Sequence, residues 1–157
     1  MYIKSLCIED DNRQIVTSNP SWEQVKNAIL SLNGRNRNTV MLEKNNEEQE
    51  LENDINEFMS ISGGGENKLY ICTFHSDVEG NGEIEMYDPD KPFTLKDTIE
   101  IARVFPGFYP LAQCFNIDKI LVAAEIYSRY GKRDKSFHWG CVSFDESSKI
   151  KITQVTS

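Results

Sequence analysis

Alternation of apolar and polar positions predicts β-structure along much of the chain. Residues 2–8 alternate loosely and predict a first strand, and residues 39–42 predict a short second one. Residues 58–62 and 69–74 are two strand-like runs. The glycine-rich residues 63–67 between them indicate a hairpin turn.

A first helix is predicted between residues 19 and 33. Asn19 or Ser21 can cap free amide groups at its start, and Pro20 suits a first helical turn. Four apolar residues then recur at helical spacing: Trp22, Val25, Ile29 and Leu32. The Asn33-Gly34 step is expected to end this helix.

A second helix is predicted to end at Gly131. Asp118 supplies negative charge near its start, where the helix dipole favours an anion. The residues at helical spacing are Ile120, Leu121, Ala124, Tyr127 and Ser128. Glycine is typical of the position just beyond a helix, so Gly131 marks the boundary.

The remaining segments complete the predicted fold. Further strand-like runs occupy residues 83–87 and 98–104, and a C-terminal hairpin is formed by residues 139–144 and 150–155. Residues 105–110, which contain two prolines, interrupt this pattern before an apolar run at residues 111–115. Residues 47–54 fit either a helical turn or a solvated loop. The sum is an α+β fold, a largely antiparallel β-sheet packed with two main helices.

Charge narrows the choice of partner. The chain carries 25 acidic and 17 basic side chains, a formal net charge of -8. Such a charge repels phosphate backbones and anionic lipid, so neither nucleic acid nor a membrane is an expected partner. A basic macromolecule is favoured, although moderate acidity also serves solubility alone.

Cysteine usage and the N-terminal sequence indicate a cytoplasmic protein. None of the cysteines belongs to a Cys-x-x-Cys pair, and we expect buried thiols in a reducing compartment: Cys7, Cys72, Cys114 and Cys141. The alternative is that cysteines distant in sequence meet in the fold and pair. Residues 9–11 are acidic before any signal-peptide core has formed. No apolar run approaches the length of a membrane span.

Catalytic chemistry has few candidates. His75 and His138 are the only histidines, and neither lies in a metal-binding or nucleophile motif. A nucleophilic site formed by His75, Cys72 and nearby acids is one alternative, but such sites are recognised by geometry. The glycines at 63–65 precede a strand and lack the Gly-Lys-Ser/Thr step of a phosphate-binding loop. We therefore expect no enzyme, and a plain turn at the glycines.

Residues 77–88 concentrate negative charge. Their acidic spacing, central glycine and following isoleucine imitate an EF-hand calcium loop. Glu79 at the third position, Asp88 in place of the final bidentate glutamate, and strand-like flanks depart from that motif. An exposed acidic hairpin is favoured over a calcium site.

This acidic hairpin is the predicted partner-binding surface. Its residues are Asp77, Glu79, Glu83, Glu85, Tyr87, Asp88 and Asp90. Electrostatic complementarity speeds association and selects partners, whereas affinity requires aromatic anchors. Tyr87, Phe108 and Tyr109 are the candidate anchors. A solvated loop with core aromatics is the alternative.

Several short patterns recur in the order of one known family. They are a helix around Trp22, the Ile61-Ser62-Gly63-Gly64-Gly65 step, the Tyr70-Ile71-Cys72 strand, and residues 117–131 followed by His138-Trp139. Together they resemble the first-numbered immunity protein family of bacterial polymorphic-toxin and contact-dependent-inhibition systems. The likeness spans roughly residues 20–140.

The resemblance implies a single domain over residues 1–157 that binds the C-terminal domain of a cognate toxin. That toxin domain would be a nuclease or deaminase, expected to be basic, and the inhibition would be stoichiometric and without cofactor. Trp139 and the glycines at 63–65 match the family pattern, and we expect both to be structural. The alternative function is a small intracellular ligand- or calcium-binding module built on residues 77–88.

Overall fold

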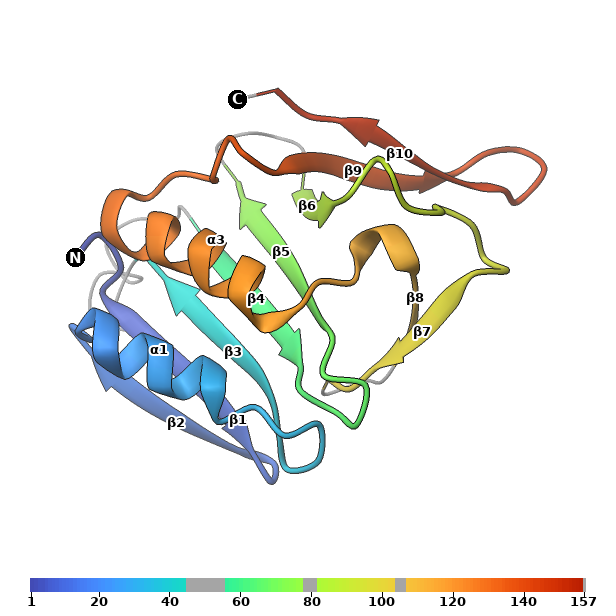
Figure 1. The fold of residues 1–157 in the computed structure, drawn as a ribbon. Coiled ribbons are helices and arrows are strands. Elements are labelled where there is room, and N and C mark those ends of the chain that lie inside the picture. The colour runs from blue at the N-terminus through green and yellow to red at the C-terminus, as the bar shows by residue number, and fades with distance from the viewer. Residues whose placement is uncertain (45–55, 78–81, 104–106, 157) are drawn as a thin grey trace.

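The computed structural model describes residues 1–44, 56–77, 82–103 and 107–156, and its centre is one eight-stranded sheet (Figure 1). The strands of this sheet are β1 (Ser5–Asp10), β2 (Arg13–Ser18), β3 (Arg37–Glu43), β4 (Glu57–Gly63), β5 (Tyr70–Ser76), β6 (Gly82–Tyr87), β9 (His138–Phe144) and β10 (Ile150–Gln154). Their spatial order is β10-β9-β6-β5-β4-β3-β1-β2. Every neighbouring pair is antiparallel.

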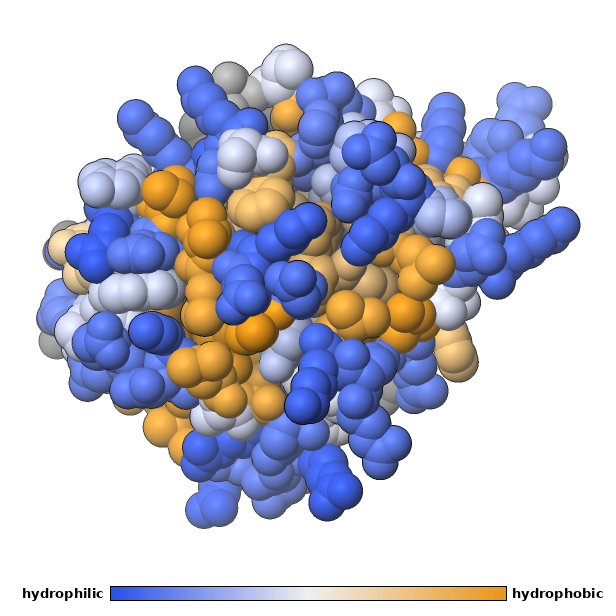
Figure 2. Space-filling model, viewed as in Figure 1, coloured by the Kyte–Doolittle hydropathy of each residue, from blue (hydrophilic) through white to orange (hydrophobic). Residues whose placement is uncertain are grey.

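Two helices, α1 (Trp22–Leu30) and α3 (Ile117–Tyr130), lie side by side over one face of this sheet (Figure 1). The main apolar core fills the space between helices and sheet, and Tyr127, Ile29 and Ile61 are among its fully buried side chains. Figure 2 views this helical face, where apolar residues are interspersed with hydrophilic ones. The predicted α+β class, a largely antiparallel sheet with two helices, is confirmed.

Local sequence explains where α1 begins. The Ser21 hydroxyl accepts a hydrogen bond from the Gln24 amide at 3.3 Å, and the Gln24 side chain accepts one from the Ser21 amide at 2.8 Å. This reciprocal capping box satisfies two amide donors that the first turn would leave unpaired. Of the two predicted caps, Ser21 is therefore the one used. The helix ends at Leu30, slightly before the predicted boundary.

Helix α3 ends as predicted. Asn116 caps its start through a side-chain oxygen 3.1 Å from the Lys119 amide. Gly131 closes it in the left-handed conformation, with φ of 64°. A Cβ atom at Gly131 would lie 2.3 Å from the ring of Tyr2, so the backbone conformation favours glycine there and any side chain would displace that ring.

The predicted hairpins β4–β5 and β9–β10 are confirmed, with Ile61 opposite Cys72 and Ile152 opposite Val142. Strand β2 was not predicted. It is an edge strand whose residues are almost all exposed, so burial imposes no alternation on its sequence. The charged residues 47–54 lie outside the described part of the chain.

The prediction for residues 98–115 is partly wrong. Strand β7 (Thr98–Ile101) is shorter than expected, and the predicted interruption contains β8 (Gly107–Pro110), which pairs with β7 in a separate two-stranded sheet. Pro110 stands at the end of β8, where a missing amide donor is tolerated. Residues Leu111–Gln113 then form a 3-10 helix.

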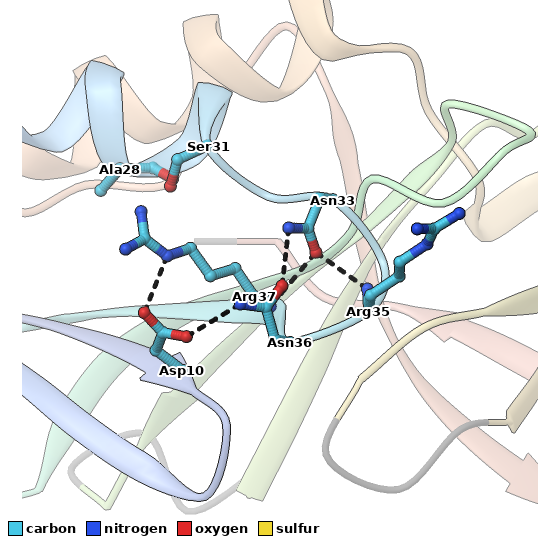
Figure 3. A network of polar contacts seen from close by, with 7 residues as sticks. All are labelled: Asp10, Ala28, Ser31, Asn33, Arg35, Asn36 and Arg37. Carbon is cyan, nitrogen blue, oxygen red and sulfur yellow. Dashed lines mark hydrogen bonds and ion pairs between the residues drawn. The ribbon is translucent and has the colours of Figure 1, made fainter.

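A polar network fixes the loop between α1 and β3 (Figure 3). The Asn33 side-chain oxygen accepts hydrogen bonds from the Arg35 and Arg37 amides at 2.9 and 3.2 Å. Asp10 of β1 pairs with the Arg37 guanidinium at 2.9 Å and accepts a hydrogen bond from the Asn36 side chain at 3.2 Å. The loop is thereby tied to the sheet.

The glycine-rich turn after β4 packs against this loop. A Cβ atom at Gly64 would lie 2.4 Å from the Leu32 carbonyl oxygen, and Gly64 has φ of 84°. Trp139 is also buried, and its indole nitrogen donates a hydrogen bond to the Asp134 carbonyl at 3.0 Å. Both features therefore have the structural roles expected of them.

Candidate functional site

The pleat of β5 separates two faces of the main sheet. Tyr70, Cys72 and Phe74 belong to the core beneath the helices. Ile71, Thr73 and His75 alternate with them, so their side chains point to the opposite face. Both described helices lie on the first face, and we call the second one the uncovered face because no described helix lies on it, although Ile71 at one end of it packs against Ile101 and Cys114.

Polar side chains line much of the uncovered face. Ser60 of β4 lies opposite Thr73 of β5, which lies opposite Glu85 of β6. The hydroxyl groups of Thr39 and Ser62 are hydrogen-bonded across β3 and β4 at 2.9 Å. All five of these residues are buried, so this part of the face is polar but has little accessible surface of its own.

A cavity of about 370 Å³ opens on this face. It is lined by strands β1, β3, β4, β5 and β6 and by one residue beyond β7, through the side chains of Glu9, Thr39, Met41, Phe58, Ser60, Thr73, His75, Glu83 and Arg103. Among the described lining residues, Arg103 is the only arginine or lysine. We call this space the sheet cavity.

One wall of the sheet cavity is aromatic. The rings of Phe58 and His75 are stacked, with centroids 5.0 Å apart and planes inclined by 19°. His75 lies opposite Glu83 across β5 and β6, and its Nε2 atom is 3.1 Å from a carboxylate oxygen of Asp77. The Asp77 pair restricts the imidazole ring, so the wall is held in place.

Glu85 lies beside this cavity and is buried, with 9% of its surface exposed. Burial, followed by the nearby charge of Glu83, raises its pKa to about 8, while Arg103 and a hydrogen bond from Gln113 act in the opposite direction. Its Oε2 atom has no hydrogen-bond partner in the described regions. Glu85 is thus a carboxyl group that gains or loses a proton near neutral pH.

Arg103 is positioned by β8. Its guanidinium group lies 5.8 Å from the centroid of the Tyr109 ring and donates a hydrogen bond to the Tyr109 hydroxyl. Tyr109 in turn packs on a second apolar cluster formed by Ile71, Ile101 and Cys114. The two-stranded sheet therefore brings a cation to the edge of a cavity that also contains Glu9 and Glu83.

The predicted partner-binding residues do not form one exposed hairpin. Asp77, Glu83 and Asp90 are exposed and Asp88 is half-buried, but Glu85 and Tyr87 are buried, which corrects the expectation for these two. Tyr87 packs near the His138 ring, at 5.6 Å between centroids. Glu79 lies outside the described residues.

The candidate anchors and thiols also divide by exposure. Phe108 is 70% exposed, whereas Tyr109 is half-buried.

The four cysteines are free thiols. Cys7, Cys72 and Cys114 are buried, and Cys141 is half-buried. Cys72 points into the core while His75 points to the uncovered face, so the alternative nucleophilic site does not form. Burial also raises the pKa of Cys72 and stabilises its neutral thiol.

The calcium alternative gains no support from the described residues. Residues 78–81 of that loop lie outside them, and the rest hold no group of three or more His, Cys, Asp or Glu side chains suited to a metal. Within the same residues, no helix has the length and apolar character to cross a membrane.

Sequence reasoning missed Glu9, Phe58, His75 and Arg103 as members of one site. The polar positions of β5 and β6 carried a signal, since both Thr73-Phe74-His75 and Glu83-Ile84-Glu85 alternate polar and apolar residues. No local sequence pattern connects Arg103 with these positions.

Comparison of the chain with protein-family models, with curated proteins and with solved structures finds no match.

Proposed function

We propose that this chain is an immunity protein that binds and neutralises a basic bacterial toxin domain, a nuclease or deaminase, by stoichiometric contact in the cytoplasm. The observation that carries the proposal is the presence of Glu9 and Glu83 in the lining of the sheet cavity on the uncovered face. Arg103 is the one arginine or lysine among the described lining residues, so negative charge is in excess there.

Electrostatics supports a basic partner. An enzyme that acts on nucleic acid presents a positively charged cleft to its substrate, and a protein with a formal charge of -8 is attracted to such a cleft. Carboxylates held on a sheet face can occupy positions that phosphate groups would take. Association would thereby exclude the nucleic acid.

The accessible surface area of the chain and an exposed aromatic side chain support a protein partner with an interface of ordinary size. A typical interface covers about 800 Å² on each partner, which is only part of the 8868 Å² accessible surface of this chain. Phe108 is exposed on β8, the strand that also carries Tyr109, the partner of Arg103. An aromatic anchor of this kind supplies the affinity that surface charges alone do not.

Co-expression tests this function directly. The chain is co-expressed with the C-terminal domain encoded immediately upstream of its own gene, and cell survival and co-purification are both measured. We expect survival together with a one-to-one complex. A harmless neighbouring domain, or toxicity with neither rescue nor complex, would contradict the immunity function.

The sheet cavity itself favours a second candidate function, that of a small intracellular ligand-binding module. Its volume of about 370 Å³ lies within the usual range of ligand pockets. A ligand that binds only the folded chain would raise its melting temperature. For the calcium version, a melting temperature unchanged by added calcium would remove that alternative.

A further inference from the structure

We propose that the sheet cavity binds a guanidinium group, presented by an arginine side chain of the partner. This inference rests on the proposed function for the source of the arginine, while the chemistry of the cavity is argued from the chain alone. The juxtaposition that carries it is a stacked aromatic wall beside two glutamates of the cavity lining, Glu9 and Glu83.

The aromatic wall suits a planar cation. A guanidinium group stacks on aromatic rings and donates hydrogen bonds from its edge, whereas an ammonium group is a compact and strongly hydrated charge. Phe58 and His75 offer ring surface at the cavity, and Glu83 lies opposite His75 on the neighbouring strand. A cation against this wall therefore meets a carboxylate at its edge.

The carboxylates retain capacity to accept hydrogen bonds. The Glu83 side chain makes no hydrogen bond or ion pair with other residues that the structure describes. Glu9 accepts one hydrogen bond, from the Gln14 side chain at 2.7 Å, and its other oxygen is uncommitted within the described regions. The Oε2 atom of Glu85 is likewise unpartnered there, although the side chain is nine-tenths buried.

Thr73 connects Glu85 with the cavity. Thr73 lines the cavity and is the cross-strand neighbour of Glu85, and Glu83 stands two residues before Glu85 on the same face of β6. A buried acceptor without a partner is unfavourable, because the group has lost its hydrogen bonds to water. Glu85 itself is not part of the cavity lining, so the carboxylates that a ligand in the cavity meets directly are Glu9 and Glu83.

The chain already places one guanidinium group, that of Arg103, at the edge of the cavity. This group lies against Tyr109, and its charge favours the ionised form of Glu85. Among the described residues, Arg103 forms no ion pair with Glu9 or Glu83, so both carboxylates remain available to a second cation. The cavity volume of about 370 Å³ is far larger than the roughly 30 Å³ that one water molecule occupies. Space therefore remains for a second guanidinium group beside that of Arg103.

Titration of the isolated chain tests the chemistry without any toxin. The probes are N-acetylarginine amide and N-acetylcitrulline amide, which have nearly the same shape but differ in charge. Amide signals of Thr73, His75 and Glu83 are followed by two-dimensional NMR. We expect saturable shifts with the arginine probe and binding of the citrulline probe weaker by about tenfold or more, the loss that follows from one charge-assisted hydrogen bond.

Three single variants assign the binding to the cavity. Glu9→Gln and Glu83→Gln each remove one carboxylate that lines the cavity and are expected to weaken binding of the arginine probe by about fivefold or more. Glu66→Gln makes the same charge change at an exposed residue of the β4–β5 turn, and is expected to bind as the unmodified chain does. Unshifted amide signals away from the cavity verify that each variant is folded.

Equal binding of the two probes, or undiminished binding by both glutamate variants, would overturn the inference. Rescue from the toxin domain without any binding of the arginine probe would also overturn it, and would leave the immunity function standing. Probe binding without rescue would support the cavity chemistry and contradict the proposed function. The full proposal predicts that changing one arginine of the toxin domain to glutamine weakens the complex by about tenfold. It also predicts that the effects of this change and of Glu83→Gln are not additive when the two are combined.

Discussion

Glu85 lies directly opposite Thr73 on the uncovered face of the sheet and is buried, whereas Glu83, two residues earlier on the same strand, is exposed. Burial, followed by the charge of Glu83, raises the pKa of Glu85 to about 8, from an ordinary value of 4.5. Arg103 and Gln113 favour its ionised form but do not reverse the shift. Folding is therefore coupled to the protonation of one side chain.

This coupling predicts that the chain loses stability as pH rises. Between the two pKa values the folded chain holds a proton on Glu85 that the unfolded chain has released, so higher pH favours unfolding. We expect Glu85 to remove on the order of 3 to 5 kcal/mol from the free energy of unfolding between about pH 5 and about pH 9. Urea denaturation at a series of pH values measures it.

The variant Glu85→Gln isolates this contribution from other titrating groups. It carries no ionisable group at this position, so its stability should exceed that of the unmodified chain at about pH 9 and match it closely at about pH 5. Glu66→Gln serves as the control and should follow the unmodified chain at every pH. Parallel curves for Glu85→Gln and the unmodified chain would refute the coupling.

Adjacent glycines supply a matched pair for the turn after β4. Gly64→Ala is expected to destabilise the chain by about 2 kcal/mol or more, because the new Cβ would meet the Leu32 carbonyl and φ at this position is 84°. Gly65→Ala places a Cβ with nothing within 4 Å, so its effect should be about 0.5 kcal/mol or less. Denaturant unfolding compares the two. Equal effects would contradict the packing of this turn on the α1–β3 loop.

Two tyrosines share one carboxylate beneath the helices. The hydroxyl of Tyr2 donates to Glu57 Oε1 at 2.8 Å and that of Tyr127 donates to the same atom at 3.4 Å. Tyr2→Phe should lower the free energy of unfolding by about 1 to 2 kcal/mol, since it removes the shorter bond to a charged acceptor. Tyr127→Phe should have a smaller effect because its bond is longer. A larger loss for Tyr127→Phe would reverse this ranking.

The two helices were predictable because their signals are local. Ser21 and Gly131 mark boundaries through hydrogen bonding and backbone conformation that depend on a few neighbouring residues. Strand β2 was missed because an edge strand exposed to solvent needs no alternating pattern. Its turn did carry a signal, since Asp11 and Asn12 both adopt positive φ, which Asp and Asn tolerate better than most residues.

The site was less predictable because its members meet only through sheet order and tertiary packing. The sequence Glu83-Ile84-Glu85 correctly indicates a strand with two polar positions on one face. It does not indicate that Gln113 and Arg103 lie near Glu85. Glu85 was therefore assigned to an exposed hairpin although the segment after β7 approaches it.

Charge reversal distinguishes the sheet cavity from the rest of the acidic hairpin as the partner-binding surface. Glu83 and Asp90 are both exposed and lie near opposite ends of β6, so each can be reversed without burying a lysine. Glu83→Lys should weaken binding of the toxin domain by about tenfold or more and reduce the dependence of affinity on salt. Asp90→Lys should change affinity by less than about threefold, acting mainly on the association rate.

Affinity and association rate are measured by surface plasmon resonance at two salt concentrations. Glu146→Lys, in the exposed turn between β9 and β10, is the control for overall charge. If Asp90→Lys weakens the complex more than Glu83→Lys does, the contact surface lies at the far end of the hairpin and not at the cavity. If all three reversals are equivalent, net charge alone steers the toxin domain, and neither surface is a specific binding site.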